Sequence, residues 1–431
     1  MRFTSVFFLL ILILVFPASN LYSQNLDYAK SIVNTLASED YMGRGYTKKA
    51  DLKAANFIKD EFRRHGIEPI NSEYFRYFNL DVNTFPGKME ISLNGQKLRP
   101  GIDYLTDPSS PSLKGSFEVI RIRRQDLNKP DVLSEILMAT AGKALMIDMN
   151  DTVKFSPSES EKISKLVDAI KYDPELKNPL TIILSDKKLI WGISGRQAKK
   201  AVVTLHSGEL NPDDISFIEV DIKARLQRNY KTQNVIGIIP GKTVPDSFLV
   251  VTAHYDHLGI MGKETCFTGA NDNASGIAML LNLAKYFAEN PPKYTLVLIA
   301  LSAEELGLLG AASISNDPGL ETGKIRFLVN FDMAGTGEEG IMVVNATVFK
   351  EEFERLQQLN STESLLPSVR SRGEACISDH CIFYMKKVPC FYIYTLGGIT
   401  AYHDIFDRAE TLPLSAFDNY LKLMISFFET F

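Results

Sequence analysis

Polar residues follow directly after continuous apolar runs at several points in the second half of this chain. These runs are FLVVTA before His254, TLVLIAL before Glu304 and Glu305, and RFLVN before Asp332. Short apolar runs of this kind are typical of parallel strands that are buried on both faces. Ligands of open α/β sheets bind beyond the carboxyl ends of such strands, so we expect these polar side chains to converge at one edge.

Five residues in this half of the chain supply two imidazoles and three carboxylates. They are His254, Asp272, Glu305, Asp332 and His403. Nitrogen and oxygen donors of this kind suit zinc or a similar divalent ion. One ion would not use all five donors, but two ions that share a carboxylate would, and two-metal hydrolytic sites hold their ions ~3.5–4 Å apart. The set predicts two Zn²⁺ ions per chain.

Asp272 is the natural bridging carboxylate between the two ions. It lies in a tight turn flanked by glycines, GANDNASG at 269–276, just ahead of a helix-like run over 274–287. Glu304 is then left over beside the ligand Glu305. An uncoordinated carboxylate next to the attacking water is suited to act as a general base.

Five short blocks resemble the co-catalytic zinc aminopeptidase family, a branch of the zinc exopeptidases that includes glutamate carboxypeptidases, glutaminyl cyclases and the transferrin receptor. The blocks are HYDH at 254–257, GANDNASG at 269–276, AEE at 303–305, FDM at 331–333 and YHD at 402–404. The resemblance covers residues 230–431 well and 27–66 weakly. It extends to SDH at 378–380 and to the aspartate that closes YHD-x-x-D at 407.

The resemblance implies a role for each polar residue of these blocks. One ion would be held by His254 and Asp332, the other by Glu305 and His403, and both by Asp272. Glu304 would be the general base. Asp256 matches an outer-shell aspartate that orients the site. His257 stands where many members carry a small residue, and no metal is assigned to it.

Simpler interpretations exist for each block taken alone. Asp272 with Asn273 could cap the helix that follows. Glu304 and Glu305 could stabilise the first turn of a helix through its dipole, and His403 could be structural. All five ligand types occur in the family's order, however, and this favours the metal site.

The implied activity is peptide hydrolysis, in which one ion holds the free N-terminal amine of a peptide substrate. A glutaminyl-cyclase-like acyltransferase, a carboxypeptidase and a catalytically silent receptor stay open as alternatives. Against the cyclase, Tyr402 precedes the final histidine where cyclases carry tryptophan, and the only tryptophan is Trp191. Tyr394, Tyr402 and Phe383 are candidates for a substrate pocket, although such aromatic residues are as often core.

Length and composition fit an enzyme of two domains. A chain of 431 residues with 45% hydrophobic residues is too long for one simple domain. Its 47 basic and 52 acidic residues give a net charge of −5, and the lysine pairs are scattered. Nucleic-acid binding is therefore disfavoured.

The first residues have the layout of a cleaved secretory signal. A basic start is followed by an apolar core over 6–16, then by Pro17 and small or polar residues, which predicts a signal peptide over 1–23. The core is too short for a membrane span of about 20 residues. We expect export to a periplasm or the outside, with no membrane attachment after cleavage. The oligomeric state cannot be read from the sequence.

The remaining chain is predicted to fold as a discontinuous catalytic domain with an insertion. Residues 24–84 and 228–431 are expected to form a mixed, mostly parallel α/β sheet sandwiched by helices. Residues 85–227 carry short alternating runs such as MEISL and FEVIRI, with one charged helix near 159–171, and predict a β-rich insert. Its position resembles the protease-associated domain of larger relatives.

The four cysteines are Cys266, Cys376, Cys381 and Cys390. Cys376 and Cys381 are close enough in sequence to close a small loop around SDH, and disulfides persist in oxidising compartments. Buried free thiols are the alternative interpretation.

Overall fold

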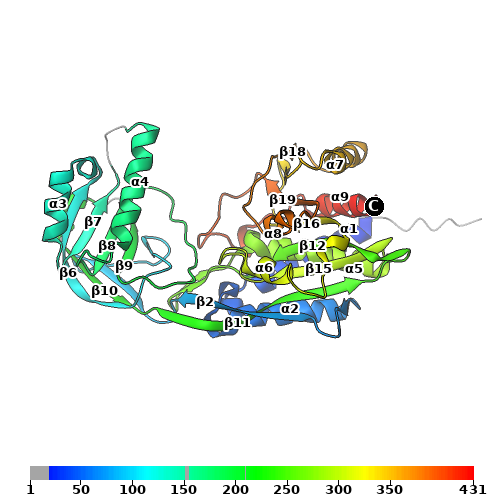
Figure 1. Ribbon diagram of the computed structural model, residues 1–431, viewed down its shortest axis with the longest axis horizontal. Helices are drawn as coiled ribbons and strands as arrows, with labels where there is room; N and C mark the ends of the chain where they lie inside the picture. The colour runs from blue at the N-terminus through cyan, green and yellow to red at the C-terminus, as the bar shows by residue number, and fades with distance from the viewer. Residues whose placement is uncertain (1–18, 151–154, 209) are drawn as a thin grey trace, which may run out of the picture.

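Two large sheets lie side by side in the computed structural model, which describes residues 19–150, 155–208 and 210–431 (Figure 1). The first has nine strands in the order β1-β11-β15-β12-β16-β19-β17-β18, with β2 also paired to β11. Its strands are β1 (Glu68–Pro69), β2 (Phe75–Thr84), β11 (Arg225–Ile239), β12 (Val244–His254), β15 (Tyr294–Leu301), β16 (Ile325–Phe331), β17 (Gly340–Val344), β18 (Val369–Ser371) and β19 (Cys390–Leu396).

The centre of the nine-stranded sheet is parallel. β15, β12, β16 and β19 run in one direction, while β11 is antiparallel to β15, and β17 is antiparallel to β19 but parallel to β18. The apolar runs of the sequence form these central strands because both faces are covered by helices. This confirms the predicted mixed α/β sheet, in which the antiparallel pairs involve strands outside the central four.

Helices cover the two faces of this sheet. Leu249 and Val251 of β12 point into a core shared with one set of helices, and Val250 between them points into the core on the opposite face. The first set is α1 (Ser19–Leu36), α2 (Ala50–Arg64), α5 (Gly276–Glu289), α7 (Lys350–Glu363) and α9 (Phe417–Glu429). The other face is covered by α6 (Leu309–Ile314) and α8 (His380–Met385).

The second sheet has eight strands in the order β4-β3-β10-β6-β7-β8-β9-β5. They are β3 (Met89–Leu93), β4 (Gln96–Leu98), β5 (Tyr104–Thr106), β6 (Leu113–Arg123), β7 (Ala144–Asp148), β8 (Leu180–Ser185), β9 (Ala201–His206) and β10 (Phe217–Ile222). β6 to β9 are parallel, and α3 (Pro130–Ala139) and α4 (Pro157–Tyr172) lie between them in the chain. The charged helix was predicted, but α3 was not.

The molecule has two lobes, one built on the nine-stranded sheet and one on the eight-stranded sheet. β2 and β11 run from one lobe to the other (Figure 1). Thr84 and Arg225 are register partners in this antiparallel pair, so the chain leaves the first sheet and returns to it at adjacent points. A shared apolar cluster joins the lobes, because Phe85 and Trp191 pack with Leu258 and Phe267. The domain boundaries at 84/85 and 227/228 stay a prediction.

The predicted signal peptide falls mostly outside the described residues, which begin at Ser19 with α1. The helices expected over 28–36 and 50–62 lie within α1 and α2. A short hairpin of β13 (Gly259–Met261) and β14 (Thr265–Phe267) follows β12. Within the described ranges, every helix is too short or too polar to cross a bilayer.

Candidate metal centre

The ends of three neighbouring parallel strands carry the polar residues that the sequence singles out. His254 is the last residue of β12, Glu304 and Glu305 follow β15, and Asp332 follows β16. Asp272 lies in a π-helical turn, Ala270–Ser275, directly before α5. The loop after β19 adds the fifth predicted ligand, so the structure brings all five together.

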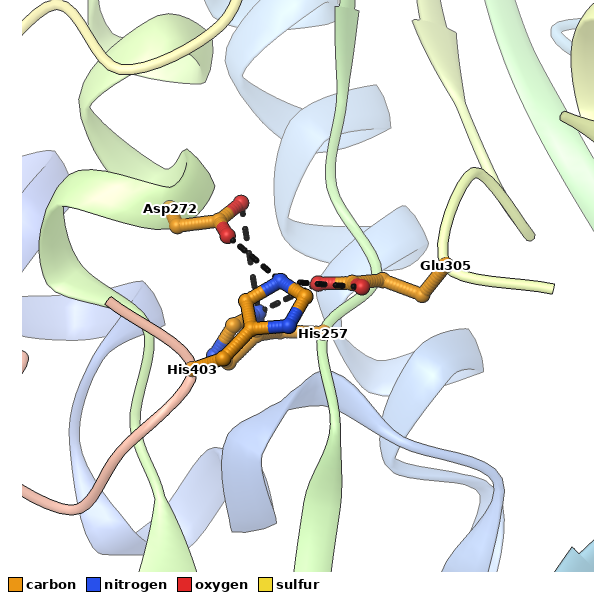
Figure 2. Close-up of side chains that lie close together, drawn as sticks. All are labelled: His257, Asp272, Glu305 and His403. Carbon is orange, nitrogen blue, oxygen red and sulfur yellow. Dashed lines mark hydrogen bonds and ion pairs between the residues drawn. The ribbon is translucent and has the colours of Figure 1, made fainter. Parts of the chain in front are cut away.

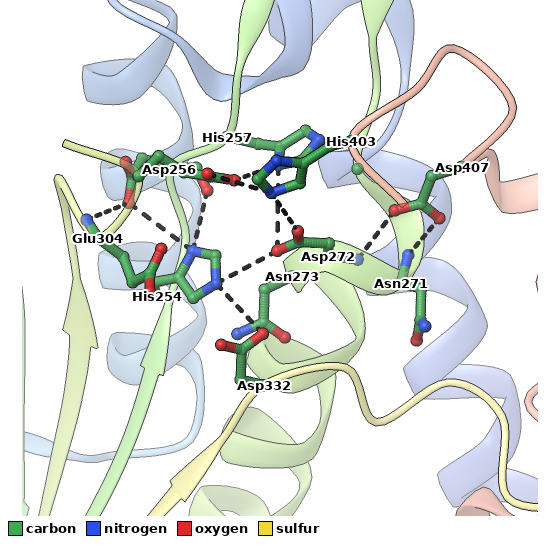
Figure 3. Close-up of polar contacts among 12 residues, drawn as sticks. His254, Asp256, His257, Asn271, Asp272, Asn273, Glu304, Asp332, His403 and Asp407 are labelled. Atoms are coloured by element: carbon green, nitrogen blue, oxygen red, sulfur yellow. Dashed lines mark hydrogen bonds and ion pairs between the residues drawn. The ribbon is translucent and has the colours of Figure 1, made fainter. Parts of the chain in front are cut away.

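The carboxylate of Asp272 joins two groups of donors. Its Oδ2 lies 3.0 Å from Nε2 of His403, and that nitrogen lies 3.2 Å from Oε2 of Glu305 (Figure 2). Its Oδ1 lies 3.3 Å from Nε2 of His254, and that nitrogen lies 3.4 Å from Oδ1 of Asp332 (Figure 3). Each oxygen of Asp272 therefore serves one donor group.

These distances fit two tetrahedral metal ions. Zinc bonds of about 2.0–2.1 Å to nitrogen and oxygen place neighbouring ligand atoms about 3.3–3.4 Å apart. The four distances within the two groups run from 3.0 to 3.4 Å. The donor types and their spacing both suit zinc.

Buried carboxylates dominate the electrostatics of the site. Burial by itself lowers the pKa of His403, but hydrogen bonds with Asp272 and Glu305 outweigh it and raise that pKa to about 11. Burial also disfavours the charged form of His254, whose pKa is nevertheless raised well above its usual value by Asp332 and other carboxylates. The site thus favours positive charge at both imidazoles.

The imidazoles in turn lower the pKa values of the carboxylates Glu305 and Asp272. Burial raises the pKa of Glu305, yet the imidazoles of His257 and His403 bring it down to about 2. Burial opposes ionisation of Asp272 as well, and hydrogen bonds with His254 and His403 hold its pKa well below the usual value.

Glu304 lies on the wall of the site and is only partly buried. Burial raises the pKa of its carboxyl group well above the usual value, and Asp379 and Glu305 add to the rise. Its backbone N–H donates to Oδ1 of Asp256 at 3.2 Å, while the Tyr46 hydroxyl donates to Oδ2 at 3.2 Å. The position of the glutamate turn thus depends on Asp256.

Asn273, rather than Asp272, caps the helix that follows. Its side-chain oxygen accepts hydrogen bonds from the backbone N–H of Gly276 and of Met333, at 2.9 and 3.0 Å. Asp407 accepts from the backbone N–H of Asp272, at 2.9 Å, and so holds the turn from outside. The carboxylate of Asp272 is left free to face the two histidines.

His257 is a residue of the site to which the sequence analysis assigned no ligand role. It is fully buried, and its Nδ1 lies 2.7 Å from Oε1 of Glu305, the oxygen that faces away from His403 (Figure 2). That separation is a hydrogen bond, shorter than the ligand spacing, and Asp272 is 4.0 Å away. The HYDH block places His257 near the site, but its contact with Glu305 has no signal in the sequence.

Arg44 holds the loops of the site together from beneath. Its fully buried guanidinium donates only to backbone carbonyl groups, at distances from 2.6 to 3.2 Å. The acceptors are Leu36, Tyr255, Thr268, Gly269 and Asp272. No local sequence pattern indicates this role for Arg44, because its acceptors lie up to 228 residues away.

A pocket of about 590 Å³ opens over the donor groups. Tyr394 and Tyr402 line it as expected, together with Arg372. Phe383 does not, because it is fully buried in the core between the sheet and α8.

A disulfide joins Cys376 to Cys381 and confirms the hypothesised pairing. Cys376 lines the pocket, and within the closed loop the Ser378 hydroxyl donates to Oδ2 of Asp332 at 2.7 Å. The loop around SDH therefore helps to orient a predicted ligand.

Comparison with known proteins links these residues to one peptidase family. Residues 234–428 match the model of peptidase family M28. Aminopeptidase YwaD of Bacillus subtilis is 35% identical over 125 residues, which are 28% of this chain and 26% of that protein. A probable zinc metalloprotease of Pyricularia oryzae is 34% identical over 123 residues, 28% of this chain and 24% of that protein. The matched segment spans about a quarter of these relatives.

Two solved structures share the fold of nearly the whole chain. The zinc aminopeptidase BSAP of Bacillus subtilis has a TM-score of 0.65 at 20% identity, with 94% of this chain and 93% of that chain covered. A peptidase M28 precursor of Shewanella amazonensis has a TM-score of 0.66 at 18% identity, with 95% and 96% covered. The family match includes all five predicted metal ligands and Glu304. The similarity to peptidase family M28 is thus carried by residues 234–428, and the likeness over the rest of the chain is one of fold.

Proposed function

We propose that this protein is a two-zinc aminopeptidase that removes N-terminal residues from peptides. The observation that carries the proposal is the placement of Asp272, whose two oxygens face two separate donor groups. The match of residues 234–428 to a peptidase family and the fold shared with a zinc aminopeptidase support it.

Each polar residue of the site has a role in this proposal. His254 and Asp332 would hold one ion, Glu305 and His403 the other, and Asp272 would contribute one oxygen to each group. When bound there, zinc would supply a Lewis acid for the scissile carbonyl and would lower the pKa of the attacking water, so that it loses a proton more readily.

Glu304 acts as the general base. It takes a proton from the attacking water and passes it to the leaving amine. Because burial raises the pKa of this carboxyl group, Glu304 can hold the proton between the two steps. Asp256 keeps Glu304 in place through the backbone N–H of the glutamate.

The substrates are peptides with a free N-terminus. A neutral N-terminal amine can donate its lone pair to one of the ions, and the rest of the peptide can extend through the pocket that opens over the donor groups. The tripeptide Leu-Gly-Phe should therefore release free leucine, and acetylation of its amine should suppress cleavage. Efficient cleavage of the acetylated peptide would contradict the proposal.

A glutaminyl cyclase is the first rival activity. The indole of Trp191 is buried and donates its N–H to the carbonyl of Thr106 at 2.8 Å, so it does not line the pocket. A peptide that begins with glutamine separates the two activities. Ammonia release with a blocked product would favour the cyclase, whereas we expect stepwise hydrolysis.

A carboxypeptidase is the second rival, and Arg372 is the observation that favours it. Among the described residues that line the pocket, it is the only lysine or arginine, and its guanidinium donates to the Tyr394 hydroxyl at 3.1 Å. Product analysis decides, because a carboxypeptidase would release phenylalanine from Leu-Gly-Phe.

The pair Glu304 and Glu305 gives a matched test of base against ligand. Glu304→Gln should lower kcat by at least about 10²-fold and leave zinc content unchanged, because an amide cannot accept the proton of the attacking water. Glu305→Gln should lose one zinc ion. Loss of zinc from Glu304→Gln, or its near-normal turnover, would contradict the assignment of the pair.

The proposal includes export from the cell. The signal-like start of the sequence and the disulfide of Cys376 with Cys381 support it, since disulfides persist in oxidising compartments. The mature protein should begin near Gln24, which N-terminal sequencing of exported protein would test. An intact N-terminus in the cytoplasmic fraction would contradict it.

A further inference from the structure

The final ligand, His403, is held by a backbone segment from the other lobe. Its Nδ1 lies 3.0 Å from the carbonyl oxygen of Trp191, and its own carbonyl accepts the backbone N–H of Trp191 at 2.9 Å. A proton on Nδ1 that is donated to this carbonyl leaves the lone pair of Nε2 for a metal ion. Nε2 is the atom that faces Asp272 and Glu305.

We propose that residues 188–191, here called the strap, belong to the metal centre and control the affinity of the ion held by His403 and Glu305. The inference rests on the proposed function, because it takes these two residues as ligands. It assigns to the eight-stranded lobe a role in metal binding, although none of the described residues that line the pocket belongs to that lobe.

Lys188 fastens the strap to the loop on both sides of His403. Its Nζ lies 2.6 Å from Oδ2 of Asp404 and donates to the carbonyl of Thr400 at 2.7 Å. The Asp404 side chain is almost fully buried, with 6% exposed. Lys188 therefore restrains the ligand loop at two points within four residues of the histidine.

Trp191 fixes the other end of the strap to the second sheet. Its indole N–H donates to the carbonyl of Thr106 in β5. Its ring centroid lies 4.5 Å from that of Phe267, in the apolar cluster shared by the two lobes. The carbonyl that meets His403 is thus anchored by packing and by a hydrogen bond.

The backbone of His403 needs this support. Its φ is +50°, in the left-handed region that is unfavourable for a residue other than glycine. Both hydrogen bonds to Trp191 stabilise this conformation. Outer-shell partners of metal-binding histidines commonly contribute about 10–100-fold to metal affinity.

Zinc affinity, rather than activity, is the quantity to measure. Competition with a chromophoric chelator should give two dissociation constants for the wild-type protein. Lys188→Met should raise one of these dissociation constants about 10-fold and leave the other unchanged. Lys187→Met, at the exposed neighbouring lysine, should change neither. Trp191→Phe keeps an aromatic ring but loses the N–H that donates to Thr106. It should raise the same dissociation constant as Lys188→Met.

A double variant shows which ion is affected. His403→Ala should bind one zinc ion, and adding Lys188→Met to it should have no further effect on that ion. Suppose that the wild-type protein binds two ions. If the strap variants then leave both zinc affinities unchanged, or lower both equally, the inference is overturned and the proposed function stands. If wild-type protein binds no zinc, both are overturned.

Discussion

At the scale of single residues, Asp272 and Asn273 divide two tasks that either could perform. Asn273 caps α5 with its side-chain oxygen, and Asp272 keeps both carboxylate oxygens for His254 and His403. Aspartate and asparagine cap helices equally well, so the sequence alone left open which of them does so. The convergence of His254, Glu305 and Asp332 was predictable from their positions after apolar strands, but this division of tasks was not.

His257 could not be predicted as a partner of Glu305, because 48 residues separate the two in the chain. Arg44 is a stronger case, since its acceptors lie up to 228 residues away. Contacts of this kind leave no local pattern in a sequence. They depend on how the loops meet once the sheet has formed.

His257→Phe should lower the affinity for the zinc ion that Glu305 is proposed to bind. The substitution removes the N–H that holds Oε1, so Oε2 is no longer fixed toward His403. We expect about a 10-fold higher dissociation constant for one ion and no change for the other. Chelator competition would measure both.

His257→Gln is the control for this prediction. Its amide can still donate to Glu305, so the affinity should be largely restored. A loss in the glutamine variant as large as in His257→Phe would instead indicate that His257 is itself a ligand.

The pH dependence of zinc affinity should extend above the usual range of histidine. The pKa of His403 is about 11 and that of His254 is also raised, so zinc must displace a proton from each at neutral pH. Affinity should therefore rise at least about tenfold per pH unit from pH 6 to pH 9. Chelator-buffered titrations would measure it. An affinity that levels off above pH 7, as for a histidine of pKa about 6.5, would contradict the expectation.

At the scale of elements, the central strands were predictable because each is a single apolar run. Helix α3 was missed, although Leu133, Ile136 and Leu137 have the spacing of an apolar helix face. This helix buries that face only partly, and its polar residues resemble those of a loop. The sequence therefore predicted one α-helix between residues 85 and 227, where the structure has α3 and α4.

The turns after the central strands have a conformation that the sequence does not indicate. Ala303 and Met333 follow β15 and β16 with φ values of +60° and +65°. Each is adjacent to a functional carboxylate, Glu304 in one case and Asp332 in the other. Backbone strain of this kind collects at functional sites, where the surrounding structure over-determines it.

Arg44→Met should destabilise the fold around the metal centre. Five carbonyl groups would lose their donor in a fully buried place, which we expect to lower the free energy of unfolding by roughly 3 kcal/mol. Urea denaturation of purified protein would measure it. Arg63→Met is the matched control, because that side chain is 61% exposed, and its effect should stay within about 0.5 kcal/mol. Equal effects of the two variants would contradict the role of Arg44.

At the scale of the whole molecule, the metal centre concentrates buried negative charge where the two lobes meet. Burial raises the pKa of Asp256 to about 6 and that of Asp379 to about 8, in the same region as the ligands. Cations bound only by the folded chain should relieve this repulsion and stabilise the entire protein.

Zinc at about 100 times its dissociation constant should add about 2.7 kcal/mol per site to the free energy of unfolding. Thermal unfolding with and without a chelator would show it as a shift in Tm. Magnesium should give a much smaller shift, because imidazole ligands suit zinc better. Equal shifts with the two metals would indicate a site of a different kind.

The pairing of Thr84 with Arg225 also bears on how such a protein could have arisen. Because these residues face each other in neighbouring strands, a turn of a few residues could join them and leave the nine-stranded sheet as a simple hairpin at that point. Insertion of a second lobe at this point would therefore require no rearrangement of the nine-stranded sheet. Once acquired, a lobe that touches His403 would be hard to lose, since its removal would leave that loop without its neighbours.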